Sequence, residues 1–149
     1  MIQLMHDLYP NLCTQFIDIS HPELYEIIKL SIGNPTNAKI HAVLENYKTL
    51  DHHLIGCLLD NNLIGIIGTQ LVGLNINIKH ISVKLEYQYK GIARHLVHSV
   101  MSNFKVASII TETDDESIGF YNKLGFECQP IENVYGRRYQ CILNMWDIL

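Results

Sequence analysis

A strand, a loop and a helix follow one another between His80 and His98, and this stretch constrains the fold more than any other. Strand-like alternation of apolar residues ends at Val83, and apolar residues then recur at helical spacing from Ile92 to Val100. Gly91 lies at the hinge between loop and helix, and the small Ala93 follows two residues later. Small residues at a helix start let a ligand approach the backbone, where free N–H groups and the helix dipole suit an anion. The stretch predicts a phosphate-binding helix N-terminus, although a purely steric role of the glycine stays open.

Two motifs in this half of the chain resemble the signatures of one enzyme family. The segment 88–93 has the spacing Gln-x-x-Gly-x-Ala, which resembles the pattern Arg/Gln-x-x-Gly-x-Gly/Ala. Downstream, the segment 117–126 resembles the pattern Ala-x-x-Phe-Tyr-x-x-Leu-Gly-Phe. Both motifs, in this order and separation, are similar to those of the GCN5-related N-acetyltransferases, the GNAT superfamily. The resemblance covers clearly the half of the chain from His80 onward, and the remainder in the order of its elements only.

Length and composition narrow the class of protein. The 149 residues most simply form one domain spanning 1–149, long enough to bury a core. A hydrophobic content of 48% against 17% charged residues excludes a disordered chain. The formal net charge of -4, with no basic stripe, argues against a nucleic-acid partner. Polar residues interrupt every apolar run before the ~18 residues that a membrane span needs, so no membrane partner is expected.

The beginning of the chain and its cysteines favour a reduced, cytoplasmic protein. Residues 1–7 carry no basic region and no cleavage signal, so export is not expected. Cys13, Cys57, Cys128 and Cys141 show no CxxC or paired spacing, and we expect reduced core cysteines rather than a disulfide or zinc framework. The eight histidines show no metal-ligand spacing either, so no metal is expected.

Two helices are predicted in the first half of the chain. Ser20 as N-cap and Glu23 as the partner in a capping box would begin the first, whose apolar face runs from Leu24 to Ile32. The residues Gly33-Asn34-Pro35 end it, and a second helix capped by Thr36 runs to about Tyr47.

Most of the other predicted elements are strands. Asp60, Asn61 and Asn62 tolerate positive φ and predict a hairpin turn. A helix runs from Gly91 to about Phe104, and the strand after this crossover should lie parallel to the third strand of the meander. Asp114 or Asp115 caps a further helix that ends at Gly125. The segment 16–19 reads equally as a short strand or as the end of a helix. The other predicted strands are 54–59, 63–71, 77–83, 106–111, 126–130 and 139–145.

In this order the elements resemble the GNAT fold, an α+β fold with a mixed sheet. That fold has two N-terminal helices, an antiparallel meander, a central strand–loop–helix site for acyl-coenzyme A, a splayed parallel strand pair and C-terminal strands.

The resemblance implies that the chain binds acetyl-coenzyme A as cosubstrate through its backbone. In the family, amides of the loop and helix start hold the pyrophosphate, and the third meander strand pairs with the pantetheine arm as an added strand would. Lys90 and Arg94 would add charge near the phosphates, or be solvated side chains without that role. Asp114 and Ser117 stand where members often carry Asn and Ala. The residues assigned to acetyl-coenzyme A by resemblance are Ile81, Ser82, Val83, Gln88, Tyr89, Lys90, Gly91, Ile92, Ala93, Arg94, Asp114 and Ser117.

Tyr121 is the side chain that the resemblance implies in catalysis. The matching tyrosine of the family donates a proton toward the departing coenzyme A sulfur, and a phenol with a pKa of about 10 stays protonated at neutral pH. The alternative is an aromatic that packs at helical spacing with Ile118 and Leu124.

No general base emerges from the sequence. Attack on the thioester requires a neutral amine, so a side chain or water must take the ammonium proton. Several family members place a Glu or His four residues before the end of the third meander strand, but this position is Lys79, which is a poor base. Alternation turns the adjacent His80 to the other face unless a bulge re-aims it. Glu112 and the pair His52-His53 are weaker candidates.

We therefore expect an N-acetyltransferase that moves acetyl directly from acetyl-coenzyme A to a primary amine of a small molecule or peptide. The first rival is a non-catalytic acyl-coenzyme A binding or sensing module, and the second is an interaction domain with purely structural glycines. The loops Gly33–Asn37 and Gly136–Arg138 would flank the acceptor, where Arg137 and Arg138 either favour an anionic group or are simply solvated. A homodimer stays open.

Overall fold

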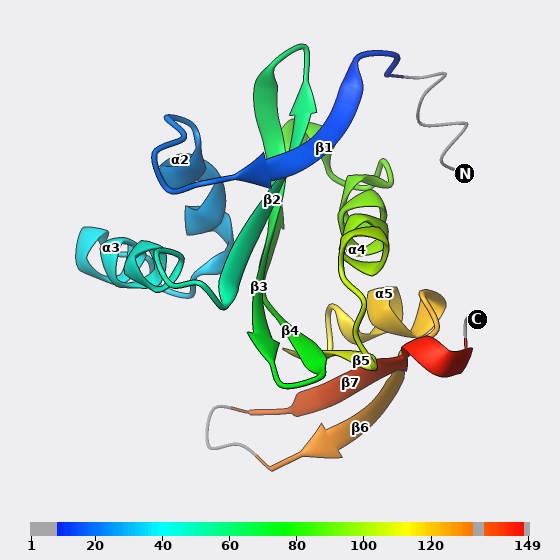
Figure 1. Cartoon of the computed structure of the whole chain (residues 1–149). Helices are drawn as coiled ribbons and strands as arrows, with labels where there is room; N and C mark the ends of the chain where they lie inside the picture. Colours follow the sequence, from blue (N-terminus) through cyan, green and yellow to red (C-terminus); the bar gives the residue numbers. More distant parts are fainter. Residues whose placement is uncertain (1–8, 133–135, 148–149) are drawn as a thin grey trace. The chain divides into compact units, whose positions relative to one another are not determined.

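The computed structural model describes residues 9–132 and 136–147 (Figure 1). The chain divides into two compact units. The N-terminal unit comprises Met1–Thr69 and His80–Phe104, and the C-terminal unit comprises Gln70–Lys79 and Lys105–Leu149. The single domain over 1–149 therefore stays a prediction. The expectation drawn from residues 1–7 lies outside the described residues.

The described strands form one mixed sheet in the order β1-β2-β3-β4-β5-β7-β6. β4 pairs with β5 in parallel, as predicted, while β1 with β2, β5 with β7 and β6 with β7 are antiparallel. The α+β class with a mixed sheet is thus confirmed. The strands are β1 (Leu12–Ile17), β2 (His52–Leu59), β3 (Asn62–Val72), β4 (Asn75–Val83), β5 (Ser108–Thr113), β6 (Glu127–Ile131) and β7 (Arg138–Asn144). The α-helices are α2 (Leu24–Ile28), α3 (Asn37–Asn46), α4 (Ile92–Asn103) and α5 (Ile118–Lys123).

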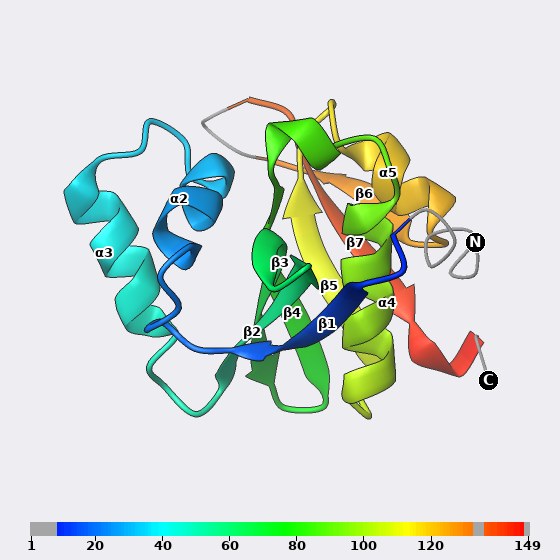
Figure 2. The same cartoon turned by 90° about the horizontal axis from the view of Figure 1, so that it is seen from above.

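In the N-terminal unit, helices cover both faces of the strands (Figures 1 and 2). α2 and α3 lie on one face of β2 and β3, and α4 lies on the other. The predicted apolar faces of α2 and α3 form the core with β2 and β3, because transfer of these side chains out of water is the main favourable term in folding. The buried members of this cluster are Leu24, Ile27, Ile28, Ile40, Tyr47, Leu54, Leu58, Leu63 and Ile66.

The two predicted helix starts have different outcomes. Thr36 caps α3 as expected, since its side chain accepts a hydrogen bond from the Lys39 amide at 3.2 Å. The capping box at Ser20 and Glu23 is wrong, because α2 begins at Leu24 and Glu23 makes no side-chain cap bond. Ser20 instead bonds through its amide and hydroxyl to the carboxylate of Asp18, which closes a turn after β1. The ambiguous segment thus belongs to the end of a strand and the turn after it, not to a helix.

Residues predicted in turns have the expected positive φ in both units. Asp60 and Asn61 have φ of 50° and 66° between β2 and β3. Gly125 follows the end of α5 with φ of 97°. The predicted cap of α5 by Asp114 or Asp115 is wrong, because Ser117 is the N-cap and makes no side-chain cap bond. Asp114 instead accepts bonds in the turn before the helix, from the amides of Glu116 and Ser117 at 3.1 and 3.0 Å.

The expectation of four reduced cysteines is wrong. Cys128 and Cys141 form a disulfide that joins β6 to β7 within the C-terminal unit, while Cys13 and Cys57 are free thiols. The two bonded residues stand directly opposite each other in the antiparallel register. A separation of 13 residues gives no hint of that pairing, because register is set by the turn and by the buried faces.

The described residues contain neither a membrane-spanning helix nor a cluster of metal ligands. None of the helices within 9–132 and 136–147 is long and apolar enough to cross a membrane. Over the same ranges, His, Cys, Asp and Glu form no group of three or more that could hold a metal ion.

Candidate active site

The start of α4 has the geometry that the sequence predicts for an anion seat. Gly91 is the N-cap in the left-handed conformation, with φ of 88°. The first helical bond runs from the His95 amide to the Gly91 carbonyl at 3.0 Å. The amides of Ile92, Ala93 and Arg94 precede that bond, so they are the first N–H groups of the helix, which have no intrahelical acceptor. Their dipoles and the helix dipole together favour a negative group at this end.

The loop before α4 is tied to the neighbouring strands. The Lys84 amide donates to the Ile64 carbonyl of β3 at 2.8 Å. The side-chain amide of Gln88 donates to the Val83 carbonyl at 2.9 Å, so Gln88 anchors the loop to the end of β4. Tyr89 is fully exposed and has φ of 60°, the second left-handed residue of the loop. These contacts fix the backbone path that leads into the helix.

Close packing holds α4 against the sheet of the N-terminal unit. A Cβ at Gly65 would lie only 3.2 Å from Ile92 and from the Ser82 carbonyl, so the glycine admits the first turn of the helix. The Ser82 hydroxyl donates to the Ile27 carbonyl of α2 at 2.7 Å. The Ser82 side chain is therefore engaged on the α2 side, and only its backbone remains for the predicted pairing with pantetheine.

The two cations predicted near the phosphates differ in setting. Lys90 is exposed, and Arg94 on the first turn of α4 is partly buried. Within the described ranges, neither side chain belongs to an ion pair. Burial and then the charge of Arg94 lower the pKa of His98, one turn along the helix.

Tyr121 is enclosed in the C-terminal unit, with 4% of its surface exposed. Its ring packs edge-on against Phe120 and Phe126, with centroids 5.0 and 5.3 Å away. Burial raises the pKa of Tyr121, while a hydrogen bond with the Thr111 side chain opposes that rise in part. The phenol is therefore protonated at neutral pH, so the structure combines the packing role and the chemical requirement for the donor role.

A cavity of about 410 Å³ opens over β4, β5 and β7 of the C-terminal unit. Three of its residues carry charge, namely Lys79, Glu112 and Arg138. Thr111, which contacts Tyr121, also lines it. The other lining residues are Val72, Asn75, Asn77, Ile78, Ile110 and Gln140.

The candidate bases are dispersed among different environments. Lys79 and Glu112 are exposed and line the cavity of the C-terminal unit. His80, in the N-terminal unit, has its Nδ1 2.6 Å from the hydroxyl of Tyr47. Burial raises the pKa of Tyr47 above its ordinary value, so this phenol is neutral at physiological pH.

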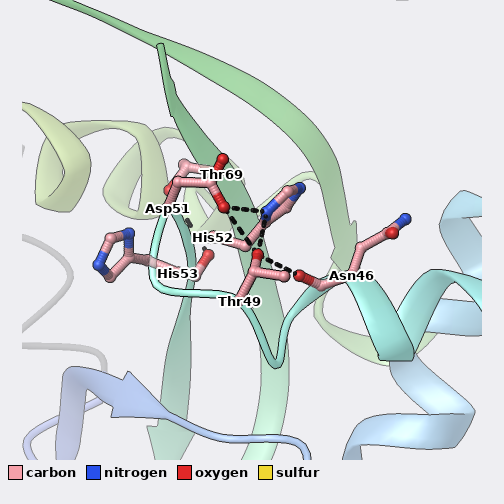
Figure 3. A network of polar contacts seen from close by, with 6 residues as sticks. All are labelled: Asn46, Thr49, Asp51, His52, His53 and Thr69. Carbon is pink, nitrogen blue, oxygen red and sulfur yellow. Dashed lines mark hydrogen bonds and ion pairs between the residues drawn. The ribbon is translucent and has the colours of Figure 1, made fainter. Parts of the chain in front are cut away.

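His52 and His53 do not act together, because their rings point in opposite directions from β2 (Figure 3). His52 joins a polar network in which its Nδ1 lies 2.7 Å from the Thr49 hydroxyl and 2.9 Å from the Asp51 carboxylate. The His53 ring packs edge-on with Phe16 and Phe104. Each ring is therefore engaged in contacts within the fold, His52 through polar groups and His53 through aromatic packing.

Thr111 and the polar face of β4 were missed at the level of sequence. Asn75, Asn77 and Lys79 alternate along β4 and so share one face of the strand. That alternation was visible in the sequence and marked a polar strand face. The contact between Thr111 and Tyr121 was not visible, because it depends on how α5 packs against β5.

The family model for the acetyltransferase (GNAT) domain matches residues 36–145. No curated protein matches the sequence. Among solved structures, a GNAT family acetyltransferase from Elizabethkingia anophelis with acetyl-CoA bound has a TM-score of 0.70 at 19% identity, over 90% of this chain and 98% of that one. An aminoglycoside 6'-N-acetyltransferase complexed with coenzyme A has a TM-score of 0.77 at 15% identity, over 89% and 97%.

A third similar structure is the ribosomal-protein-S18-alanine N-acetyltransferase from Escherichia coli. Its TM-score is 0.70 at 20% identity, over 88% of this chain and 90% of that one. At these identities the structures share the fold with this chain, whereas the family model covers most of its length. The chain belongs to the GNAT acetyltransferase family.

Proposed function

We propose that this protein is an N-acetyltransferase that transfers the acetyl group of acetyl-coenzyme A to a primary amine by direct attack in a ternary complex. The start of α4 is the observation that carries the proposal. Gly91 in the left-handed conformation is followed by the amides of Ile92, Ala93 and Arg94, which suit the pyrophosphate. The backbone of Ile81–Val83 would pair with the pantetheine arm, and these residues lie further along β4 than Asn75–Ile78, which pair with β5.

Tyr121 is proposed as the group that gives a proton to the departing sulfur. Its raised pKa keeps the hydroxyl protonated, and a neutral phenol is the form that can donate. In the transfer, the amine nitrogen forms a bond to the carbonyl carbon of the thioester and the bond from that carbon to sulfur breaks. The amine loses a proton and the sulfur gains one, so no oxidant or reductant is involved.

An amine acceptor is supported by the names of the similar structures. One of these acetylates aminoglycosides, and another acetylates an alanine of a ribosomal protein. Small molecules and peptides are therefore both represented among proteins of this fold.

A thermal-shift measurement with acetyl-coenzyme A tests the proposal first. A ligand at a hundred times its dissociation constant adds about 2.7 kcal/mol to the free energy of unfolding. For a chain of this length we expect a rise in melting temperature of roughly 5–10 °C. Release of free coenzyme A in the presence of an amine panel then tests transfer itself. No shift would contradict any acyl-coenzyme A site and favour an interaction domain.

The second candidate is a non-catalytic module that binds acyl-coenzyme A. Lys79 favours it, because a charged lysine stands where several family members place a Glu or His. A thermal shift with acetyl-coenzyme A, together with no acetyl transfer over a broad amine panel, would support this second candidate.

A further inference from the structure

We propose that the cavity of the C-terminal unit binds a small zwitterion, an amine that also carries a carboxylate, and that this molecule is the acetyl acceptor. The inference rests on the N-acetyltransferase function proposed above. It assigns a chemical class to the acceptor and names the side chains that select it.

Three neighbouring strands place charges of alternating sign over the cavity. Ile78 of β4 is the register partner of Thr111 of β5, so Lys79 and Glu112 stand at the next position along each strand. Glu112 is in turn the partner of Gln140 on β7. Arg138 is two residues from Gln140 and so shares its face of the strand. The resulting order across the cavity is positive, negative and positive.

These charges have no partners of their own in the described parts of the chain. The ion pairs there join other residues, and none includes Lys79, Glu112 or Arg138. A molecule with both an ammonium and a carboxylate would complement all three. Its ammonium would pair with Glu112, and its carboxylate with Lys79 and the guanidinium fork of Arg138.

The size and the uncharged lining favour a small molecule. A volume of about 410 Å³ is within the range of small-molecule sites. Asn77 and Gln140 add amide groups that can both donate and accept hydrogen bonds. Asn75 is already engaged, because its side-chain oxygen accepts a hydrogen bond from the Ser108 hydroxyl at 2.6 Å.

The cavity is connected to the proposed proton donor within the same unit. Thr111 lines the cavity, and its side chain forms a hydrogen bond with Tyr121. Glu112 follows Thr111 directly on β5, so its side chain lies on the opposite face of the strand from that of Thr111. The strand β5 thus carries both the carboxylate proposed to hold the ammonium and the threonine that contacts the donor, which favours the acceptor over an unrelated metabolite as the occupant.

Matched pairs of amines that differ by one carboxylate provide the first test. The pairs are 4-aminobutyrate with propylamine, lysine with 1,5-diaminopentane, and phenylalanine with 2-phenylethylamine. Coenzyme A release is measured for each with the full-length protein and acetyl-coenzyme A. We expect kcat/KM to be roughly tenfold or more higher for the carboxylate-bearing member of at least one pair, because hydrogen bonds to charged groups are the strong ones. Equal rates within every pair would overturn the proposal.

Substitutions separate the two ends of the zwitterion. Lys79→Gln/Arg138→Gln should raise KM for the preferred carboxylate-bearing amine roughly tenfold or more, and leave KM for its carboxylate-free partner unchanged within about twofold. Glu112→Gln should raise KM for both members, since both carry the ammonium. Lys105→Gln/Lys123→Gln removes two exposed cations of the same unit and should change neither. A response of the control double variant equal to that of Lys79→Gln/Arg138→Gln would reduce the effect to net charge and overturn the proposal.

A binding measurement distinguishes failure of this proposal from failure of the proposed function. Calorimetric titration of each amine is made in the presence of coenzyme A, so that no turnover is required. Binding of the carboxylate-bearing amines that is lost in Lys79→Gln/Arg138→Gln, without any acetylation, would contradict the enzyme but keep the ligand class. Efficient acetylation of the carboxylate-free amines, with no preferential binding of any zwitterion, would support the enzyme and overturn this inference.

Discussion

Tyr121 joins packing and proposed chemistry in one residue, and a single substitution separates them. Tyr121→Phe keeps the ring against Phe120 and Phe126 and deletes only the hydroxyl. We expect turnover to fall roughly a hundredfold or more, as for loss of a general acid. Binding of acetyl-coenzyme A should change far less, since one hydrogen bond contributes about 0.5–1.5 kcal/mol. Steady-state kinetics and a binding titration on the same variant measure both quantities.

The turnover defect of Tyr121→Phe should also depend on pH. Burial raises the pKa of Tyr121, so the phenol stays protonated as the pH rises through the range of the assay. The coenzyme A thiol resembles cysteine, with a pKa of about 8.5, and above that pH it can leave as a thiolate. The defect of Tyr121→Phe should therefore shrink as the pH rises from 7 to about 9.5. Tyr139→Phe, which removes a hydroxyl bonded to Asp115, is the control and should turn over normally. A Tyr121→Phe variant with full activity would leave the residue a packing role only.

Gly68 is the residue at which the N-terminal unit tolerates a side chain least. A Cβ there would lie 2.0 Å from the hydroxyl oxygen of Tyr47 and 2.6 Å from the adjoining ring carbon. Tyr47 is buried and its hydroxyl lies 2.6 Å from His80 Nδ1, so the ring cannot move without disturbing that contact. We expect Gly68→Ala to lower the free energy of unfolding by about 1–3 kcal/mol, as overpacking does, measured by chemical denaturation.

Gly33→Ala is the matched control, because nothing lies within 4 Å of a Cβ at that position. Its free energy of unfolding should stay within about 0.5 kcal/mol of the parent. A denaturation midpoint for Gly68→Ala equal to that of Gly33→Ala would mean that the Tyr47 ring moves aside without cost.

For the elements, the decisive prediction concerns the junction of loop and α4. Gly91 has φ of 88°, so any L-residue there pays the strain of a left-handed conformation, about 1–2 kcal/mol. Gly91→Ala and Gly91→Glu should lose similar stability for this reason. Only Gly91→Glu adds a negative charge beside the amides proposed for the pyrophosphate, so only this variant should lose acetyl-coenzyme A binding by tenfold or more. Calorimetric titration of both variants makes the comparison, and equal affinities would move the phosphate seat elsewhere.

Elements governed by short-range chemistry could be predicted from the sequence. Thr36 caps α3, Asp60 and Asn61 form the hairpin turn, and Gly125 ends α5, each as its residue type requires. The false capping box shows the limit of such patterns. Ser20 has the right residue type, but Asp18 offers its carboxylate nearer in sequence and captures the hydroxyl. The spacing of two residues does not show which of several nearby partners a side chain will bond.

The same contrast holds for the candidate site, where some features follow from short motifs and others only from strand pairing. The left-handed Gly91 and the buried Tyr121 lie inside contiguous motifs, so their settings could be anticipated. The cavity could not, because Lys79, Glu112 and Arg138 come together only through the pairing of three strands. Strand register is set by many buried contacts at once, and a shift by one residue would turn each of these side chains to the opposite face.

For the whole molecule, the two units differ in how they are stabilised. Of the buried hydrophobic residues in the described parts of the chain, nineteen belong to the N-terminal unit and seven to the C-terminal unit, namely Ile76, Ile78, Ile109, Tyr121, Phe126, Cys141 and Leu143. A unit with less buried apolar volume gains less from transfer out of water. The C-terminal unit instead has the disulfide between Cys128 and Cys141, which links β6 to β7. A covalent link of this kind compensates in part for a small core.

Reduction of the protein should therefore lower its stability. In the chain-entropy account, a link across 13 residues stabilises by about 3 kcal/mol, because it restricts the unfolded chain. We expect a reducing agent to lower the melting temperature by roughly 6–12 °C. Cys128→Ala/Cys141→Ala should melt near the reduced protein and ignore the reducing agent, whereas Cys13→Ala/Cys57→Ala should keep the full response. If four thiols react with a labelling reagent and the melting temperature ignores reduction, the cysteines are reduced and β6 and β7 are held by their hydrogen bonds and buried side chains alone.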